Sequence, residues 1–284
     1  MTSIVCSSLI MIHYFYLQQH GRSFRNTPLI NRLQIYLAIV NITFSVWHGI
    51  DHIYVFVTLQ SLKVSVCQLI GFMFLWAFNS MGIISCFVTF SAFIMVILEK
   101  KLKFYKFDLV LWVAGIVFPF FMVVLAISCD WIGFNSQWCG IKMNLRNGPI
   151  IEMFYTALVM WIDIILSILT YGSIMAKVIR SSIRVNQMKN SDKLGTILSA
   201  DNKKMTKRFV VFLLVLFFQW LPLSIYLIIN ACGVAPPQIL VTFVITISNL
   251  GGLFNLLIYI WLQKGKIKTT SMQQQNKTTS RIQS

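Results

Sequence analysis

The sequence predicts an all-α membrane protein, a seven-transmembrane helix bundle. Three observations predict it: an apolar composition, seven long apolar runs, and an uneven distribution of basic residues between those runs. Of the 284 residues, 57% are hydrophobic and 11% are charged, whereas charged residues make up about 25% of a soluble domain. The 24 Lys and Arg exceed the 8 Asp and Glu. They lie in the gaps between apolar runs and form no basic stripe, so we expect no nucleic-acid partner.

The seven apolar runs are each a candidate for a bilayer-spanning helix, which needs about 20 residues. They cover residues 2–17, 33–59, 64–98, 109–128, 149–179, 209–230 and 240–262. The first run begins at the initiator Met, is short for a span and lacks the basic start of a signal peptide. We therefore expect the N-terminal end of its helix to be missing. Residues 1–262 are expected to form the bundle, and residues 263–284 a disordered cytosolic tail rich in Lys, Gln, Thr and Ser.

The basic residues between the runs predict the orientation, because cytosolic loops of membrane proteins carry an excess of Lys and Arg. With seven spans, 21 of the 24 basic residues lie on one side, and only Lys63, Lys142 and Arg146 lie on the other. This distribution predicts a multi-pass protein of the plasma membrane with its N-terminus outside and its C-terminus in the cytosol.

The sixth run carries a proline beside a tryptophan, Trp220-Leu221-Pro222. Proline lacks a backbone N–H and its ring crowds the preceding turn, so a helix bends at Pro222. A bent helix can act as a lever, and Trp220 is placed to change rotamer with the bend. The simpler interpretation is that Pro is common in membrane helices and Trp marks the interface with water.

Two of the six cysteines are predicted to lie together outside the cell. Cys67 begins the third run at its outer end, and Cys139 lies in the longest outer loop. Disulfides persist in that compartment, and a bond here would fix the loop across the mouth of the bundle. Two alternatives stay open: Cys129 is a competing partner, and the thiols are free and buried.

Four asparagines lie inside the runs, apart from Asn230 at the end of the sixth, and a polar group there needs a partner. They are Asn41, Asn79, Asn249 and Asn255, and we predict that they form one water-filled polar network through the core. Tyr259 follows Asn255 by four residues, so both face the same side of a helix. The alternative is that these groups only join helices, at about 0.6 kcal/mol per hydrogen bond.

Ionisable and aromatic residues in the outer half or core are candidates for ligand contact. They are Asp51, His48, Trp76, Asn79, Glu152 and Trp220. Asp163 lies deeper in the fifth run, where its charge requires a partner. His48 and His52 are four residues apart but have no third ligand near them in the sequence, so we expect no metal site. No clustered catalytic residues are evident, and we expect no enzyme.

Taken together, these features resemble a G-protein-coupled receptor over nearly the whole chain. They are Cys67 with Cys139, Trp112 in the fourth run, Trp220-Leu221-Pro222 in the sixth, and Asn255 with Tyr259 in the seventh. The stretches around Trp112 and Cys139 are similar to the cyclic-AMP-receptor-like and secretin-like branch. The stretch ending at Asn41 and Trp220-Leu221-Pro222 resemble the rhodopsin-like family.

The chain departs from the rhodopsin-like pattern at three places. Ser91-Ala92-Phe93 stands where an acidic-Arg-aromatic triplet is expected, Asn41 stands for a carboxylate, and Leu256 stands for a proline. The sodium site that this carboxylate usually provides is therefore not expected. The departures indicate a divergent branch.

The resemblance implies a receptor that binds an extracellular ligand and activates a heterotrimeric G protein through movement of the sixth helix. It implies no cofactor. Basic residues beside the third, fifth and sixth runs are expected to meet the G protein and acidic lipid headgroups. Those singled out are Lys100, Lys101, Lys203, Lys204, Lys207 and Arg208. The general excess of basic residues in cytosolic loops is the simpler explanation for them.

Two other functions stay open. Buried asparagines, Asp163 and a proline-bent helix also suit a membrane transporter of a small polar solute, although transporters usually show internal repeats or paired broken helices. A non-signalling, receptor-like protein is the other alternative, given the missing triplet. A retinal protein is excluded because residues 240–262 contain no Lys for a Schiff base.

Overall fold

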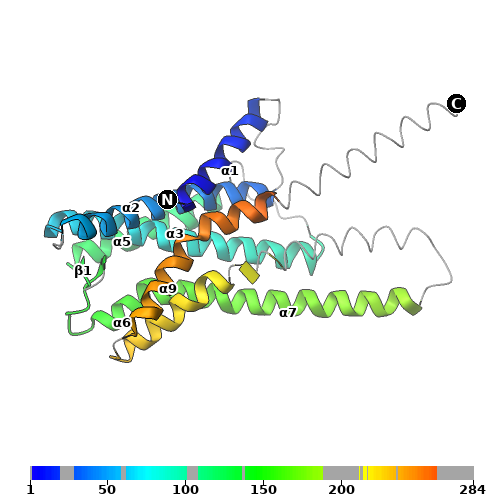
Figure 1. Cartoon of the computed structure of the whole chain (residues 1–284). Coiled ribbons are helices and arrows are strands. Elements are labelled where there is room, and N and C mark those ends of the chain that lie inside the picture. The colour runs from blue at the N-terminus through cyan, green and yellow to red at the C-terminus, as the bar shows by residue number, and fades with distance from the viewer. Residues whose placement is uncertain are drawn as a thin grey trace.

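The computed structural model describes residues 2–19, 29–58, 62–100, 108–135, 138–187, 211, 214–215, 217–234 and 236–260. Long helices lying side by side make up most of this part of the chain (Figure 1). The first three are α1 (Thr2–Gln19), α2 (Leu29–Thr58) and α3 (Val64–Val96). A short antiparallel hairpin, β1 (Ile132–Phe134) and β2 (Cys139–Ile141), lies at one end of the bundle.

The fourth and fifth helices each contain one π-helical turn. The 109–128 helix consists of α4 (Leu109–Trp112), the π turn Val113–Val117 and α5 (Phe118–Ser128). The 148–187 helix consists of α6 (Gly148–Glu152), the π turn Met153–Ala157 and α7 (Leu158–Gln187). In the first case the cause is in the sequence: Pro119 has no N–H to donate to the carbonyl four residues earlier, so the preceding hydrogen bonds shift register.

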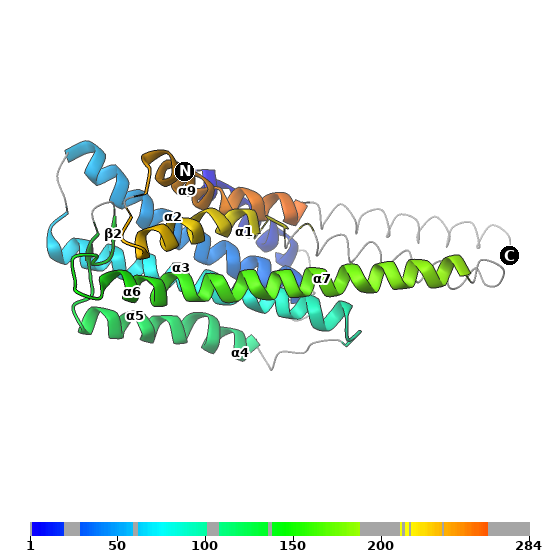
Figure 2. The ribbon, with the colours of Figure 1, turned by 90° about the horizontal axis from the view of Figure 1, so that it is seen from below.

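Two further helices complete the described part. The 217–231 helix (Phe217–Ala231) carries Pro222, and the 238–260 helix (Gln238–Ile260) begins with α9 (Gln238–Asn249) and has a turn at Leu250 before it continues. In both views the bundle is elongated, and α7 runs well beyond the other helices at the end opposite the hairpin (Figures 1 and 2). The hairpin end is the predicted outer side.

Five helices are long and apolar enough to cross a membrane. They are Asn31–Thr58, Val64–Val96, Leu109–Ser128, Gly148–Lys177 and Gln238–Ile260. The other two apolar helices, Thr2–Tyr16 and Phe217–Ala231, are shorter in the part of the chain that is described. Large apolar side chains cover the outside, for example Phe121 (64% exposed) and Ile239 (81% exposed), as lipid-facing surfaces require. The chain is therefore a mostly helical, multi-pass membrane protein, and seven spans stay a prediction.

Glycines let the helices around α3 approach closely. A Cβ at Gly82 would lie 2.7 Å from Cγ1 of Val159, and a Cβ at Gly115 would lie 3.0 Å from Cγ1 of Ile84. Without a strong hydrophobic effect between helices in lipid, close backbone approach is what makes such contacts favourable. α3 is consequently packed against α2, the 109–128 helix and the 148–187 helix at once.

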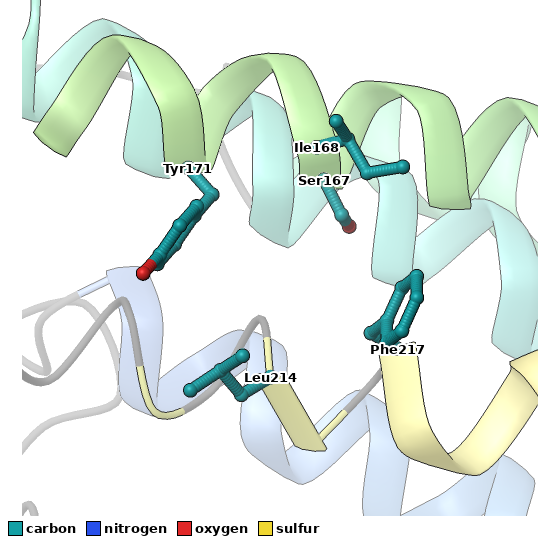
Figure 3. A pocket seen from close by; sticks show the side chains of 5 residues that line it. All are labelled: Ser167, Ile168, Tyr171, Leu214 and Phe217. Atoms are coloured by element: carbon teal, nitrogen blue, oxygen red, sulfur yellow. The ribbon is translucent and has the colours of Figure 1, made fainter. Parts of the chain in front are cut away.

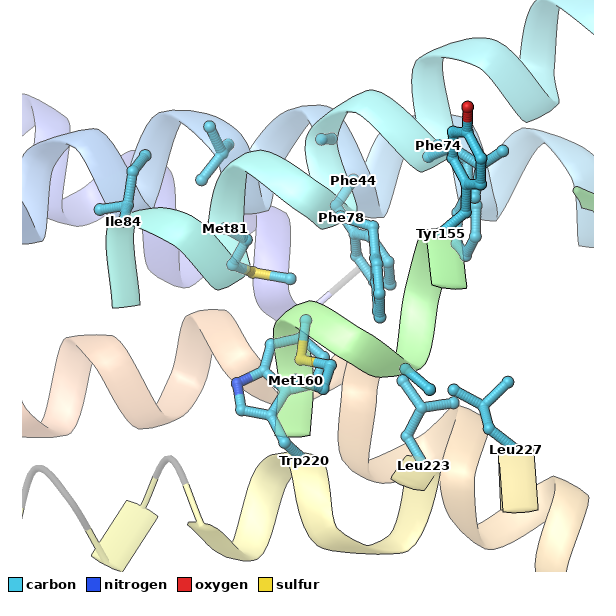
Figure 4. Close-up of a cluster of buried hydrophobic side chains, with 14 of the residues drawn as sticks. Phe44, Phe74, Phe78, Met81, Ile84, Tyr155, Met160, Trp220, Leu223 and Leu227 are labelled. Atoms are coloured by element: carbon cyan, nitrogen blue, oxygen red, sulfur yellow. The ribbon is translucent and has the colours of Figure 1, made fainter. Parts of the chain in front are cut away.

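Aromatic and sulfur-containing side chains fill the centre of the bundle (Figure 4). Phe44, Phe74 and Phe78 pack ring against ring, and Trp220 meets the edge of Phe78 at a centroid distance of 5.6 Å. Trp220, two residues before Pro222, is 1% exposed. It therefore lies in the core and not at an interface with water.

Ion pairs and polar contacts join the helices at the end opposite the hairpin. Arg32 of α2 lies 3.0 Å from Asp108 at the start of the 109–128 helix, and both side chains are largely buried. Lys177 of α7 donates to the carbonyls of Val96 and Ile97 (2.8 and 3.1 Å), which end α3 without helical partners. These contacts join α2 to the 109–128 helix and α7 to α3 at that end.

Candidate functional site

The hairpin is fixed over the outer end of the bundle by a disulfide. Cys67 of α3 and Cys139 of β2 form the bond that the sequence predicts, and Cys129 is a free, exposed thiol. The hairpin also lies directly on α3, because a Cβ at Gly71 would come within 2.7 Å of the Ile132 side chain and 3.3 Å of the Cys139 backbone. The mouth of the bundle is therefore covered.

A buried carboxylate fastens the same strand from the other side. Asp51 of α2 accepts a hydrogen bond from the backbone N–H of Cys139 at 2.9 Å. His48 and His52 lie beside it, with their Nε2 atoms 3.2 Å apart. No group of three metal-ligating side chains is found among the described residues. The structure thus places Asp51, predicted to contact ligand, where it positions the hairpin.

A small cavity lies directly beneath the hairpin, between α3, the 148–187 helix and the 217–231 helix. Its volume is about 30 Å³, which is room for one or two water molecules. Its lining residues are Phe74, Leu75, Phe78, Trp138, Gly140, Ile141, Glu152, Thr156, Leu223 and Leu227. We take this cavity as the candidate functional site, because its lining is apolar except for one carboxyl group and one hydroxyl group.

The carboxyl group belongs to Glu152, which is 4% exposed. Its two oxygens accept hydrogen bonds from two side-chain amides: Oε1 from Asn135 after the hairpin strand β1 (3.5 Å), and Oε2 from Asn230 of the 217–231 helix (3.2 Å). Thr156 donates to the main-chain carbonyl of Glu152. No Lys or Arg lines the cavity, and none of the ion pairs formed by described residues includes Glu152.

The cavity is connected to the core by aromatic rings. Phe74 and Phe78 line it and stack at a centroid distance of 6.0 Å, and Phe78 meets Trp220 edge to face (Figure 4). Trp220 itself does not line the cavity but lies beneath it, two residues before Pro222. Its indole N–H has no hydrogen-bond partner among the described residues.

Three other predicted ligand residues do not line this cavity. Trp76 is half-buried on the opposite face of α3, and its indole N–H donates to the carbonyl of Ile116 (3.0 Å) in the π turn of the 109–128 helix. Asn79 is buried and donates to the carbonyl of Leu75 (2.8 Å) in its own helix. His48 is buried against Phe44 and Phe74 and is 6.3 Å from the Trp138 ring.

The predicted asparagine network is not formed by direct contacts. Asn41 and Asn249 each donate to the carbonyl four residues earlier in their own helix, as Asn79 does. No hydrogen bond joins any two of the four asparagines, all of which are described residues. A side-chain amide that satisfies itself on its own helix has less to offer a neighbour, and this explains the difference.

A different polar contact surrounds the turn at Leu250. A Cβ at Gly251 would lie 2.4 Å from the Gln219 amide and 3.0 Å from Oδ1 of Asn41, and the N–H of Gly252 donates to Oγ of Ser3 at 2.8 Å. Polar groups of Gln219, Asn41 and α1 therefore lie close to this turn. Nearer the end of the helix, Tyr259 bonds His13 of α1 (2.8 Å), while Asn255 is buried.

Asp163 finds its partners on α3. Its carboxylate accepts hydrogen bonds from Ser85 (2.7 Å) and Thr89 (3.5 Å), and Thr89 also contacts Ser167 at 3.4 Å. Four polar groups thus satisfy one another between two helices, deep in the bundle.

A larger cavity lies next to this cluster, on the side of Pro222 away from the hairpin (Figure 3). Its volume is about 170 Å³, and it separates α7 from the chain leading into the 217–231 helix. Its lining residues are Ser167, Ile168, Tyr171, Leu214 and Phe217. These two segments are therefore less closely packed here than at the core.

The predicted G-protein-facing residues are mostly outside the described part of the chain. Lys101, Lys203, Lys204, Lys207 and Arg208 lie outside it, and Lys100 is exposed just after the end of α3. Ser91 and Ala92, where a rhodopsin-like triplet would begin, are buried. The carbonyl groups at that end of α3 accept hydrogen bonds from Lys177 of α7.

Comparison of the sequence with protein-family models and with curated proteins finds no match. The function therefore has to be argued from the residues and their geometry. Sequence reasoning identified Glu152 but missed Asn135, Asn230 and Thr156, which complete its surroundings. Only the spacing of Thr156, four residues after Glu152 on a helix, gave a signal that could have found one of them.

Proposed function

We propose that the protein is a receptor of the G-protein-coupled type, which binds an extracellular ligand in the cavity beneath the hairpin and activates a heterotrimeric G protein. The observation that carries the proposal is the continuous packing from that cavity through Phe78 to Trp220, immediately before Pro222. A seven-span bundle with its C-terminus in the cytosol, in the plasma membrane, belongs to this proposal.

The proposed movement of the sixth helix depends on the position of Pro222. A ligand that enlarges the cavity pushes Phe78, and Trp220 has no hydrogen bond of its indole N–H to break before it moves. Helix backbone on the two sides of Pro222 is less tightly coupled because proline removes one N–H···O bond. The segment between Leu214 and Trp220 then swings relative to α7, where the 170 Å³ cavity already separates the two.

Such a movement is a shift between two packings of the same bundle. A ligand changes their populations only by the difference in its affinity for the two. The basic residues of the loop before the sixth helix, Lys203, Lys204, Lys207 and Arg208, would form the surface that meets the G protein. Acidic lipid headgroups would meet the same charges.

The test is guanine-nucleotide exchange on purified G-protein α subunits, using membranes that contain the full chain. One variant replaces Lys203, Lys204, Lys207 and Arg208 with Gln. Its matched control replaces Lys264, Lys266, Lys268 and Lys277, which removes the same number of positive charges from the predicted cytosolic tail. We expect basal exchange above empty membranes, lost in the first variant and kept in the control.

A second pair of variants tests the internal connection. Phe78→Leu removes the ring between the cavity and Trp220, whereas Phe72→Leu on the same helix removes a ring that packs on Phe120 instead. We expect basal exchange to change in the first and to stay unchanged in the second.

The opposite results identify the alternatives. If no α subunit responds although the protein is folded and disulfide-linked, signalling is excluded for that panel and a non-signalling, receptor-like protein takes its place. Flux of a small polar solute into vesicles containing the chain would instead establish a transporter. Asp163 would then be the first residue to replace, since it is a buried carboxylate without a cation among its partners.

A further inference from the structure

The most informative group in the candidate site is the Glu152 carboxyl. It is buried, it lines a cavity, and among the described residues its oxygens accept hydrogen bonds from the neutral amides of Asn135 and Asn230. Hydrogen bonds to both oxygens favour the ionised form, but neutral amides supply no opposite charge. Buried charges in proteins are normally paired. The Glu152 carboxylate therefore lacks the positively charged partner that a buried charge requires.

The walls of the cavity favour the same kind of ligand. Phe74, Phe78 and Trp138 line it with aromatic rings, and the face of such a ring attracts a cation with about 0.5–2 kcal/mol. Trp138 is itself held against Tyr226 at a centroid distance of 5.7 Å. No lining residue carries a positive charge, so an anionic ligand would meet only repulsion from Glu152.

Size and hydrogen bonding narrow the class of cation. A volume of about 30 Å³ accepts a group about as large as one or two water molecules, which is the size of an ammonium group. An ammonium group has three N–H donors. The Glu152 carboxylate can accept from it, and so can Oγ1 of Thr156, whose hydrogen is used on the Glu152 carbonyl.

We infer that the cavity beneath the hairpin binds the primary ammonium group of a ligand, held by Glu152 and enclosed by Phe74, Phe78 and Trp138. The inference rests on the proposed receptor function, since it names the class of ligand for the same cavity. The hydrocarbon part of the ligand needs more room than the cavity offers in this structure, so binding requires the cavity to widen.

The test measures binding directly, without any G protein. The purified full chain is unfolded by heat with tryptophan fluorescence as the readout, in the presence of n-butylammonium chloride or of butan-1-ol at equal concentration. We expect the ammonium ion to raise the unfolding temperature in a saturable way and the alcohol, which lacks the charge, to give no saturable rise. Equal shifts for both probes would overturn the inference.

Single substitutions test whether n-butylammonium binds at Glu152. Glu152→Gln should weaken n-butylammonium binding about ten- to a hundredfold, as expected for a lost charge-assisted hydrogen bond, and Glu152→Asp should restore part of it. The matched control is Asp163→Asn, a second buried carboxyl that does not line this cavity. Binding that survives Glu152→Gln, or that disappears in Asp163→Asn alone, contradicts the assignment. Should Glu152→Gln not fold, Thr156→Val provides the same comparison, with an expected loss of about tenfold.

The α-ammonium group of a peptide offers the same chemistry as a free amine. A second arm therefore compares triglycine amide with its N-acetylated form. Stabilisation by the free amide but not by n-butylammonium would assign the ammonium group to a peptide, and the reverse would assign it to a small amine. The two proposals separate cleanly: ammonium binding without nucleotide exchange supports this inference and refutes the receptor, whereas basal exchange without ammonium binding does the opposite.

Discussion

The contact between the hairpin and α3 can be tested by adding a single methyl group. Replacing Gly71 with Ala places a Cβ 2.7 Å from Cγ2 of Ile132 and 3.3 Å from both the carbonyl carbon of Cys139 and the nitrogen of Gly140. Real Cβ atoms essentially never come within 3.0 Å of another heavy atom, so the Ile132 side chain has to move and the backbone of β2 has to give way slightly. Two of the three atoms belong to the backbone of a strand that the disulfide ties to the same helix, so little room exists for that movement.

The expected magnitude combines two opposing contributions. Overpacking of this kind costs about 1–3 kcal/mol, whereas replacing a helical Gly with Ala contributes about 0.5–1 kcal/mol in favour of folding. The matched control is Gly172→Ala in α7, where nothing lies within 4 Å of the added atom and only the favourable contribution applies. The two variants should therefore differ in stability by about 1–3 kcal/mol, with Gly71→Ala the less stable.

The assay is thermal unfolding of the two purified variants beside the unmodified protein. Each kcal/mol corresponds to about 2–4 °C in a protein of 150–250 residues and to no more than that in this longer chain, so the two unfolding temperatures should differ by a few degrees. Should Gly71→Ala unfold at the same temperature as Gly172→Ala or above it, the hairpin does not rest on α3 as described, and the cavity beneath it would have no fixed cover.

Three further predictions concern the contacts at the two ends of the bundle. Asp108→Asn removes the ionic partner of Arg32, which is largely buried, and should cost about 1–3 kcal/mol of unfolding free energy; an unchanged unfolding temperature would contradict the pairing. Cys139→Ser opens a disulfide whose cysteines are 72 residues apart. The loss of unfolding free energy should be smaller than the roughly 4 kcal/mol of the chain-entropy model, because the intervening helices stay in the membrane. Unfolding with and without reductant measures this loss. The hydrogen bond and charge of Lys177 lower the pKa of the exposed Glu99 carboxyl, so the ion pair stabilises above the usual glutamate pKa and is lost as the pH falls through the lowered value. Glu99→Gln should therefore be less stable than the unmodified protein at pH 7 but equally stable in strong acid. Lys177→Met should lower the stability further at pH 7, because it also leaves two carbonyls of α3 without their donor.

Two buried carboxylates lie next to the hairpin and have different surroundings. Asp51 bonds the backbone of Cys139, while Glu152 is joined through Asn135 to the other strand. Both are buried and both lie beside the disulfide-linked strand, yet only Glu152 lines the cavity. One carboxylate therefore positions the cover, and the other is available to a ligand beneath it.

Much of the fold could be predicted from the sequence because the bilayer imposes a length and an apolar composition on every span. The runs at 64–98 and 109–128 match the helices Val64–Val96 and Leu109–Ser128 closely. The fifth helix instead extends to Gln187, since a helix can continue into water with polar residues after the apolar run has ended. Cys67, Cys129 and Cys139 are all expected on the same side of the membrane, and the structure pairs Cys67 with Cys139 and leaves Cys129 free.

The site could be predicted only in part. Glu152 stands out as an acidic residue in an apolar run, but its amide partners Asn135 and Asn230 come from segments distant in the sequence. Trp76 looks equivalent to Trp220 in the sequence, yet the first faces the 109–128 helix and the second faces the core. Which face of a helix meets a neighbour depends on how the helices rotate against one another, and apolar residues on all sides of a membrane helix leave no periodic pattern to reveal it.

The sequence by itself determined that this chain is a helical, multi-pass membrane protein, because hydrophobic length and the placement of charge are properties of consecutive residues. Only the tertiary structure decided that Asp51 holds the hairpin, that Asn41 and Asn79 donate to carbonyls of their own helices, and that Glu152 faces a cavity. The physical reason is that a polar side chain in a membrane bonds whichever partner the packing brings within about 3 Å, and that partner is set by glycine contacts and helix rotation rather than by its neighbours in the chain.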